Sequence, residues 1–332
     1  MKVAIFGNQE FEVDFFLKAN AALHHDLVFF KESLHSGTVS MAAGFPAVCA
    51  FLTDQLDAKT LNSLAKGGTR LVALRSAGYN NIDLVAAKKL GISVMRVPAY
   101  APSAIAEHAV ALMLTLNRHV HKAYNRVREG NFDLNGLVGF NMSGKTVGIV
   151  GTGKIGTALA RIMKGFGCEL LGFDVYHQPA CIDLGMRYTD LTELMSKSDI
   201  ISLHCPLNEG TRHLVNKQTL ALMKPGSMLI NTARGGIVDA AAVIDSLKSG
   251  SGLGYFGMDV YEEENSLFFS DRSQTVIKDD VFERLTTMPN VVITGHQAFL
   301  TREALSEIAE ITLENIRSFE TGRPKQENLV SA

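Results

Sequence analysis

Three polar groups follow three successive strand-like segments in the second half of the chain. Arg234 follows the first segment, the acids Glu262 to Glu264 follow the second, and His296 follows the third. Parallel strands end at one edge of a sheet, where open α/β sheets bind their ligands. Each feature alone has a common structural explanation. The arginine could form a surface ion pair, the acids could form a solvated turn, and the histidine could be structural. Recurrence at three strand ends instead predicts a functional site that holds a cation, a carboxylate and an imidazole.

A glycine-rich turn precedes this region and predicts dinucleotide binding. The segment from Thr146 to Gly156 reads Thr-Val-Gly-Ile-Val-Gly-Thr-Gly-Lys-Ile-Gly, an apolar run that enters a turn and then a helix. Gly151 permits the tight turn, Gly153 lets the backbone approach a pyrophosphate, and Gly156 lets the helix pack against the strand. Asp174, which ends the next strand-like run, is placed to accept the hydroxyls of an adenine ribose.

Composition excludes several classes of function. The net charge is −2 over 332 residues and there is no basic run, so nucleic-acid binding has no electrostatic support. The four cysteines lack the short spacings of metal or redox sites, and we expect no metal. The chain shows neither a signal peptide nor an apolar stretch of membrane-spanning length. We therefore expect a cytoplasmic protein without membrane contact and with reduced thiols.

Strand-like and helix-like runs alternate along the whole chain, which predicts an α/β fold with two parallel sheets covered by helices on both faces. The expected strands are Val3–Phe6, Leu27–Phe30, Val48–Phe51, Leu71–Leu74, Val94–Val97, Thr146–Val150, Leu170–Asp174, Ile200–Leu203, Met228–Asn231, Tyr255–Asp259 and Val291–Thr294. Between them we expect helices that include 57–66, 83–90, 155–163 and 239–247. A C-terminal helix over about 302–319 would return to the first sheet. The expected domains are therefore 1–100 with 299–332, and 101–298.

A long helix is expected between the two domains. The segment 101–123 carries an apolar stripe that runs from Ile105 to Leu116 at helical spacing. The stripe is equally compatible with an ordinary core position and with burial against a second subunit. The proline-rich segment 98–102 just before it interrupts regular structure and marks the expected crossing between the domains.

Together these motifs resemble the D-2-hydroxyacid dehydrogenases, and most closely the lactate branch of that family. The resemblance covers essentially the whole chain and is carried by segments 74–83, 96–100, 151–156, 202–206, 231–235, 258–264 and 295–299. An insert-like run, 265–280, also matches the lactate branch. The resemblance implies a Rossmann-type cofactor domain and a flavodoxin-like substrate domain.

Residue roles follow from the resemblance, position by position. Arg234 matches the substrate-binding arginine, His296 the acid/base, and Glu264 the acid paired with it, because the second Glu of the family pattern falls on 264. Ala77 and Gly78 match the loop that holds the substrate carboxylate, and Tyr100 and Phe299 match the substrate pocket. The positions that match cofactor contacts are Gly151, Gly153, Lys154, Ile155, Gly156, Asp174, Cys205, Pro206, Thr211, Thr232, Ala233, Arg234, Asp259 and His296. Ala233 departs from the family pattern, because relatives often carry Ser or Gly at this position. The departure has little consequence for the expected cofactor contact, which the backbone makes.

The implied reaction is hydride transfer from NADH to pyruvate, with the product released as D-lactate. His296 would donate a proton to the carbonyl oxygen while Arg234 stabilises the charge on it, and Glu264 would hold the imidazolium. Two alternatives remain open at this stage. The substrate could be another small 2-oxo acid such as glyoxylate or hydroxypyruvate, or the protein could be a corepressor-like sensor of NAD. The resemblance also implies a homo-oligomer, either a dimer or a tetramer.

Overall fold

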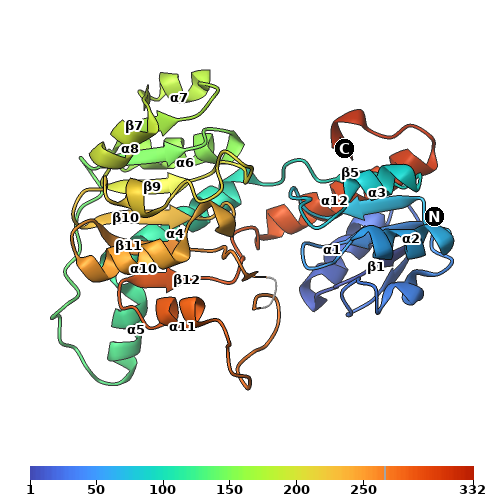
Figure 1. The fold of residues 1–332 in the computed structure, drawn as a ribbon, viewed down its shortest axis with the longest axis horizontal. Coiled ribbons are helices and arrows are strands. Elements are labelled where there is room, and N and C mark those ends of the chain that lie inside the picture. The colour runs from blue at the N-terminus through green and yellow to red at the C-terminus, as the bar shows by residue number, and fades with distance from the viewer. Residues whose placement is uncertain (265–266) are drawn as a thin grey trace. The chain divides into compact units, whose positions relative to one another are not determined.

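The chain divides into two compact units in the computed structural model, which describes residues 1–264 and 267–332. The first unit comprises Met1–Ala101 and Leu300–Ala332, and the second comprises Pro102–Phe299. Each unit is built on its own sheet (Figure 1). The expected insert at 265–280 lies partly outside the described residues, since the description omits 265 and 266.

The first unit contains a six-stranded sheet in the order β13-β5-β4-β3-β1-β2. Five strands are parallel: β1 (Lys2–Ile5), β2 (Asp26–Phe29), β3 (Ala47–Ala50), β4 (Leu71–Leu74) and β5 (Ser93–Arg96). Their order, 2-1-3-4-5, is that of flavodoxin-like sheets. The expected α/β class is confirmed, and each of the five strands lies within one residue of its expected position.

The sixth strand differs from the expected all-parallel sheet. β13 (Leu329–Val330) pairs antiparallel with Met95 and Val94 at the outer edge of β5. The chain reaches this edge from α12 through a short return, so it approaches β5 from the opposite direction. A two-residue edge strand leaves almost no hydrophobic alternation in the sequence, which explains why it was not expected.

Helices cover both faces of the first sheet. One face packs α1 (Glu10–Asn20) and α12 (Arg302–Glu320) against alternate residues such as Ile5, Ala73 and Met95. The other face packs α2 (Ala58–Lys66), α3 (Leu84–Lys89) and the short 3-10 helix η1 (Val39–Ala42) against residues such as Val48 and Val72. The two-residue period of each strand thus divides the core into two layers.

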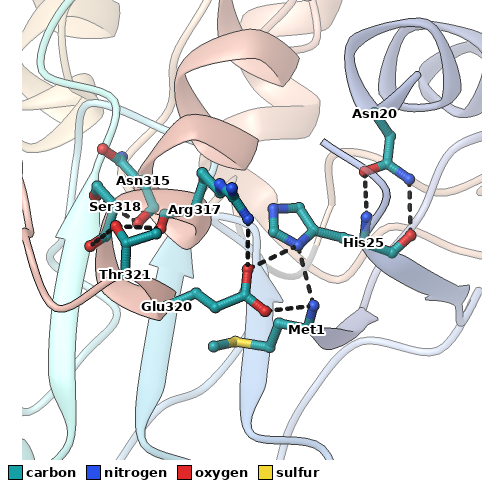
Figure 2. A network of polar contacts seen from close by, with 8 residues as sticks. All are labelled: Met1, Asn20, His25, Asn315, Arg317, Ser318, Glu320 and Thr321. Carbon is teal, nitrogen blue, oxygen red and sulfur yellow. Dashed lines mark hydrogen bonds and ion pairs between the residues drawn. The ribbon is translucent and has the colours of Figure 1, made fainter. Parts of the chain in front are cut away.

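A polar network ties the chain's first residue to the end of α12. The Met1 ammonium lies 2.8 Å from a carboxylate oxygen of Glu320, and Arg317 lies 3.5 Å from the same carboxylate (Figure 2). His25, directly before β2, places Nδ1 3.3 Å from the Met1 nitrogen. The Asn20 side chain holds the His25 backbone through two hydrogen bonds of 2.8 and 2.9 Å. The network therefore joins α1, β1, β2 and α12.

The second unit contains a seven-stranded parallel sheet in the order β12-β11-β10-β9-β6-β7-β8. Counted from β6, this order is 3-2-1-4-5-6-7, the dinucleotide-binding arrangement with one added strand. The strands are β6 (Thr146–Val150), β7 (Glu169–Phe173), β8 (Arg187–Tyr188), β9 (Ile200–Leu203), β10 (Ser227–Asn231), β11 (Leu253–Met258) and β12 (Val291–Ile293). β8 was not expected, because two residues again carry no readable period.

Helices cover both faces of this sheet as well (Figure 1). One face carries α4 (Pro102–Arg118), α6 (Lys154–Gly165) and α7 (Pro179–Asp183), which contribute to one buried cluster. The other carries α8 (Leu191–Lys197), α9 (Lys217–Leu220), α10 (Ala240–Ser249) and α11 (Asp280–Thr286). A 3-10 turn, η2 (Gly235–Ile237), follows β10.

The expected single helix over 101–123 is two helices. α4 ends at Arg118, and α5 (Val120–Arg128) begins after His119, whose φ of +49° lies in the left-handed region and stops the helical path. The apolar stripe of α4 is buried within the chain itself, where it packs on α6, β10 and β11. The stripe is therefore a core feature, and the alternative of burial against a second subunit is wrong for it.

Candidate active site

Six strand ends of the second sheet lie in register and define the edge on which the candidate site stands. Asn231 pairs with Leu203 on one side and with Met258 on the other, and Met258 pairs with Ile293. The same row continues through Val150 to Phe173. The residues that directly follow these strand ends therefore line one edge. They are Asp174, Gly151, His204, Thr232, Asp259 and Thr294.

The glycine-rich turn after β6 has the geometry of a phosphate cradle. Gly151 adopts a φ of +90°, and a Cβ there would lie 2.5 Å from the Cys205 nitrogen. A Cβ on Gly156 would lie 2.1 Å from the Gly151 oxygen, so the start of α6 must pack directly on the turn. A Cβ on Gly153 would meet nothing within 4 Å. Gly153 thus borders open space at the N-terminus of a helix, where amides and the helix dipole favour an anion.

Asp174 follows β7 and faces the same turn. Its Oδ2 accepts a hydrogen bond of 2.6 Å from the Thr152 amide, and its Oδ1 accepts one of 3.2 Å from the Tyr176 amide. The next residues, Val175 and Tyr176, are exposed. A carboxylate has about four acceptor positions, so Asp174 keeps capacity for ribose hydroxyls after these bonds are made.

Two further features of this edge fit a bound dinucleotide. The Thr232 hydroxyl is buried and has no hydrogen-bond partner in the part of the chain that the structure describes. Such an orphaned polar atom is costly unless a ligand or water satisfies it. The Thr211 hydroxyl donates to the Pro206 carbonyl at 2.6 Å and closes the loop after β9 beside Cys205. These residues fit NAD, with α6 for its pyrophosphate and Asp174 for its adenosine ribose.

His296 and Glu264 form a hydrogen-bonded ion pair. Nδ1 of His296 lies 3.0 Å from Oε1 of Glu264, and the two side chains are only 11% and 18% exposed. The other oxygen, Oε2, accepts from the Tyr261 amide at 3.0 Å, which fixes the carboxylate. Because Nδ1 is used in this pair, Nε2 is the imidazole nitrogen that remains for a substrate.

The three consecutive glutamates have different surroundings. Glu262 is bound by Arg212 at 2.8 Å and by His213 at 3.1 Å, and Glu264 is the one that contacts His296. His213 and Arg212 belong to the loop after β9, so Glu262 ties that loop to the turn after β11. The structure therefore separates a catalytic candidate from a structural ion pair within one acidic run.

Arg234 sits in a turn that its neighbours hold in place. Asn231 donates to the Arg234 carbonyl at 2.9 Å and accepts from the Ala233 amide at 3.1 Å. A Cβ on Gly235 would lie 2.0 Å from the carbonyl carbon of Tyr261, so this turn packs directly against the one that leads to Glu264. The guanidinium donates to the Ala233 carbonyl at 2.6 Å and takes part in no ion pair among the described residues. It is thus available for an anionic ligand.

Phe299 closes the same side of the second unit. It is 7% exposed, and its ring packs edge-on against the His296 imidazole with a centroid distance of 6.4 Å. Phe269 lies on the imidazole at 5.7 Å. The acid/base candidate therefore contacts two apolar rings, which limit the access of water to the imidazole.

Ala77, Gly78 and Tyr100 belong to the first unit. Ala77 and Gly78 follow β4, where the Ser76 hydroxyl donates to the Gly78 carbonyl at 2.7 Å. Arg96 donates to the Ala77 carbonyl at 2.8 Å and lies over the Tyr79 ring. With their carbonyls engaged in this way, the loop has a fixed backbone that suits recognition of a carboxylate by amides. The structure thus places the other candidate site residues together at one edge of the second sheet. Ala77, Gly78 and Tyr100 lie in the first unit.

Sequence reasoning missed residues that organise the site. Arg75, directly before the first-unit loop, is fully buried and binds Glu12 at 3.1 Å and the Gly7 carbonyl at 2.9 Å. In the second unit, His108 and Thr294 contact Asp259 beside His296. Asp259 was a candidate cofactor contact, yet its carboxylate accepts several protein hydrogen bonds. No local pattern could indicate these contacts, since each joins distant parts of the chain.

A cavity of about 780 Å³ lies at the opposite edge of the second sheet and is lined in part by Lys164, Arg187, Lys197 and Lys224. Lys164 and Lys197 stand in the last turns of α6 and α8, where cations commonly offset the helix dipole. Arg187 and Lys224 are paired with Glu193 and Asp199. We assign no role to this cavity.

Metal-ligand clusters and membrane-spanning helices are both absent from the described residues. They contain no group of three or more His, Cys, Asp or Glu side chains that could hold a metal ion. Within the same residues, no helix combines the length and the apolar character that crossing a membrane requires.

Comparison with known proteins identifies the family. Residues 110–298 match the model of the D-isomer specific 2-hydroxyacid dehydrogenase NAD binding domain. The chain is 50% identical to a 2-hydroxyacid dehydrogenase homolog of Haemophilus influenzae, with 97% of each chain covered. It is 49% identical to the D-lactate dehydrogenase of Escherichia coli, with 99% of this chain and 100% of the relative covered.

Solved structures agree in fold over the whole chain. The apo structure of the E. coli D-lactate dehydrogenase matches with a TM-score of 0.91 and 46% identity, covering 99% of this chain and 100% of that one. The pyruvate reductase of Chlamydomonas reinhardtii matches with a TM-score of 0.93 and 43% identity, covering 98% and 97%. The expected family, the NAD cofactor and the enzyme class are confirmed. The chain belongs to the D-isomer specific 2-hydroxyacid dehydrogenases and is an NAD-binding oxidoreductase of that family.

Proposed function

We propose that this protein is a D-lactate dehydrogenase that catalyses the reversible reduction of pyruvate to D-lactate by NADH. The observation that carries the proposal is the His296–Glu264 pair at one sheet edge with Arg234, whose guanidinium has no ion-pair partner among the described residues. The names of two similar proteins, a D-lactate dehydrogenase and a pyruvate reductase, support pyruvate as the 2-oxo acid.

Each side chain has a defined task in the proposed reaction. Arg234 binds the substrate through its planar fork, which suits a carboxylate and a neighbouring carbonyl oxygen. His296, as the imidazolium, donates the proton from Nε2 to the carbonyl oxygen, and Arg234 stabilises the charge that develops there. Glu264 stabilises the imidazolium and fixes the ring. Bound NADH supplies the hydride, so the protein is left to bind, orient and exclude water.

The remaining candidates bind the two ligands. Gly151, Gly153 and the amides of Lys154, Ile155 and Gly156 would hold the pyrophosphate of NAD, and Asp174 would accept from its adenosine ribose. Cys205, Pro206, Thr211, Thr232, Ala233 and Asp259 complete the cofactor site. Ala77 and Gly78 offer amides to the substrate carboxylate, while Tyr100 and Phe299 surround its methyl group. On this assignment the first unit, expected at 1–100 and 299–332 and built from Met1–Ala101 and Leu300–Ala332, is the substrate domain. The second unit, expected at 101–298 and built from Pro102–Phe299, is the cofactor domain.

A panel of 2-oxo acids tests the proposal. Pyruvate, glyoxylate, hydroxypyruvate, 2-oxobutyrate and 2-oxoisocaproate are each offered with NADH, and the product is analysed on a chiral column. We expect the highest kcat/KM for pyruvate and a product that is D-lactate. A higher value for another acid assigns the enzyme to that acid. The absence of turnover with all five, together with retained NADH binding, favours the alternative of an NAD-sensing binding protein.

We also propose that the protein is a homo-oligomer. Val120, Tyr124 and Val127 share one face of α5 and are 55%, 60% and 55% exposed, so this apolar face is uncovered in the single chain. Exposed apolar patches of this kind mark interaction surfaces. Light scattering of the wild type should give a dimer or tetramer, and Tyr124→Glu should lower the mass if α5 lies in the interface. A monomeric wild type at micromolar concentration contradicts the proposal.

A further inference from the structure

The turn that carries His296 is held by one buried carboxylate. The Asp259 side chain is 1% exposed and accepts from the Gln297 amide at 2.8 Å and from the Ala298 amide at 2.9 Å. It also accepts from the Thr294 hydroxyl at 2.5 Å, while the Asp259 carbonyl accepts from the His296 amide at 2.7 Å. Residues on both sides of His296 are therefore anchored to the end of β11.

This anchoring matters because the His296 backbone is in a disfavoured conformation. Its φ of +53° lies in the left-handed region, which L residues with a Cβ rarely adopt. Such a conformation persists only where the surrounding contacts determine it. The carboxylate of Asp259 provides those contacts, so the direction of the His296 side chain depends on it.

Two groups that belong to no assigned part of the site complete the arrangement. Nε2 of His108, on α4, lies 3.0 Å from the Thr294 hydroxyl oxygen and 3.4 Å from Oδ1 of Asp259. His108 is 17% exposed at its side chain. A chain of polar contacts is thus formed by Asp259, Thr294 and His108. It begins at Asp259, which anchors the His296 turn, and ends at His108 on α4, 186 positions before Thr294 in the sequence.

The protons that these groups carry determine which group donates and which accepts in each contact of this chain. Burial alone would raise the pKa of Asp259, but bonds from His108, Thr294, Gln297 and Ala298 outweigh burial and hold that pKa below its usual value. Asp259 is therefore an ionised acceptor, and the one proton of the Thr294 hydroxyl goes to it. The Thr294 oxygen must then accept from His108, which requires that Nε2 of His108 carries a proton.

We propose that His108 and Thr294 are positioning residues for proton transfer, which act through Asp259 to hold the His296 turn and so align the imidazole with Glu264 and the substrate. The inference rests on the proposed function for its kinetic consequences. Its structural consequence, the alignment of His296 with Glu264, holds in the free protein. Both residues act through Asp259 and neither is assigned a contact with the substrate.

The test uses conservative pairs of variants. Thr294→Val removes the hydroxyl at constant shape, and Thr294→Ser keeps it. His108→Leu removes the donor, and His108→Gln keeps an N–H near the position of Nε2. Thr312→Val is the matched control, because the Thr312 hydroxyl is buried in the first unit without a partner among the described residues.

Steady-state kinetics give the first readout, with the 2-oxo acid that the wild type reduces fastest. We expect kcat to fall about tenfold to a hundredfold in Thr294→Val and His108→Leu, up to the scale of misplacing a reacting group by about 1 Å, with NADH Kd within about threefold of wild type. Thr294→Ser and His108→Gln should recover most of the loss, and Thr312→Val should not change kcat. Values of kcat within twofold of wild type in both deletion variants overturn the inference, as does a loss that the conservative variants do not recover.

Nuclear magnetic resonance of 15N-labelled histidine gives a readout without turnover. The His296 ring resonances are assigned by their absence in His296→Gln and are compared between the variants in the free protein at one pH. In Thr294→Val the 15N chemical shift of His296 Nδ1 should change, because a displaced imidazole loses its 3.0 Å hydrogen bond with Glu264. An unchanged Nδ1 chemical shift overturns the inference even if the protein reduces no 2-oxo acid, which separates its failure from that of the proposed function.

Discussion

The Asp174 carboxylate decides which dinucleotide the site accepts. A 2′-phosphate on the ribose would meet this negative charge, and the exposed residues that follow it, Val175 and Tyr176, offer no cation to bind a phosphate. We therefore expect kcat/KM for NADH to exceed that for NADPH by about a hundredfold or more, the effect of two to three kcal/mol of repulsion and lost hydrogen bonds. Comparison of the two cofactors at equal ionic strength measures it.

Two variants of Asp174 distinguish the effect of its charge on the preference for NADH from the effect of its hydrogen bonds. Asp174→Ala should shrink it, by weakening NADH and relieving the repulsion of NADPH. Asp174→Asn is the control, since it keeps an acceptor for the Thr152 amide, which Asp174 binds at 2.6 Å, and removes the charge alone. A wild type that uses both cofactors equally contradicts the assignment.

Lysine should not replace Arg234. Lysine keeps the positive charge but loses the planar fork that contacts a carboxylate and a carbonyl oxygen together. We expect kcat/KM to fall about a hundredfold or more in Arg234→Lys, the scale of losing one oxyanion donor. Arg212→Lys is the control, because Arg212 is exposed and pairs with Glu262. If Arg234→Lys retains activity within a few-fold of wild type, Arg234 lies outside the site.

The fall of reduction activity at high pH should depend on Glu264. Reduction consumes the imidazolium of His296, so activity must fall as the pH rises and the proton is lost. Glu264→Gln keeps the size and a hydrogen-bonding group but removes the negative charge 3.0 Å from Nδ1. The imidazolium is then less favoured, and we expect the high-pH limb of kcat/KM to move to lower pH.

The neighbouring glutamate provides the control for this limb. Glu262→Gln should leave it in place, because Glu262 is engaged by Arg212 and His213. His296→Gln should abolish most activity at every pH while NADH binding persists. A limb that stays in place or moves upward in Glu264→Gln would show that the pair does not govern the proton.

At the level of elements, the sequence predicted the long and periodic parts well. The expected strands of both sheets lie within two residues of those in the structure, since Val, Ile and Leu runs bounded by turns mark buried parallel strands. The strand ends therefore also located the edge that carries Gly151, Asp174 and His296. Short elements such as β8 and β13 were not predicted, because two residues have no period.

Local sequence patterns could not predict where a helix breaks or which distant parts of the chain are in contact. His119 separates α4 from α5 through a left-handed backbone, although neither glycine nor proline marks the position. The link between His108 and Asp259 depends on how α4 packs over β11 and β12. Family likeness selected Glu264 from three adjacent glutamates, whereas the spacing alone left them equivalent.

The end of α12 offers a prediction for the stability of the first unit. Hydrogen bonding to the N-terminal ammonium is the main effect that lowers the pKa of Glu320 (Figure 2). A carboxyl whose folded pKa is depressed stabilises the fold above its unfolded pKa of about 4.3, and this contribution is lost as the pH falls through the folded value. Glu320→Gln should therefore lower the free energy of unfolding at pH 7 by about 1 kcal/mol or less, since the side chain is 32% exposed.

The difference between the wild type and Glu320→Gln should shrink as the pH falls below about 4.3, the unfolded pKa, and should vanish below the folded pKa, where both side chains are neutral. Chemical unfolding at pH 7 and pH 3.5 measures it. Glu314→Gln is the control, because Glu314 and Lys325 form an ion pair in which both side chains are 44% exposed. A difference that is as large at pH 3.5 as at pH 7 would assign the effect to packing and not to charge.

For the molecule as a whole, four fully or partly buried histidines couple stability to pH in the same direction. Burial lowers the pKa of His25, His119 and His121, and it lowers that of His204 to about 4. Near neutral pH the folded chain holds these side chains uncharged. Below the usual histidine pKa of about 6.5, the unfolded chain takes up protons that the folded chain cannot, so acid should destabilise the fold.

His204 should make the largest single contribution to this acid sensitivity. Nε2 of His204 lies 2.8 Å from the Ser202 hydroxyl, and Nδ1 is buried without a partner among the described residues. In the imidazolium both nitrogens carry a proton, and the proton on Nδ1 would have no hydrogen-bond acceptor among those residues. The stabilisation lost between pH 7.5 and pH 5 should be on the order of 2 kcal/mol for this residue, and the loss should continue toward pH 4. Thermal unfolding of the cofactor-free protein across this range should show Tm falling as the pH falls. His204→Gln keeps a group for Ser202 but cannot titrate, so its Tm should fall less steeply, whereas an equally steep fall would place the acid sensitivity in the other histidines.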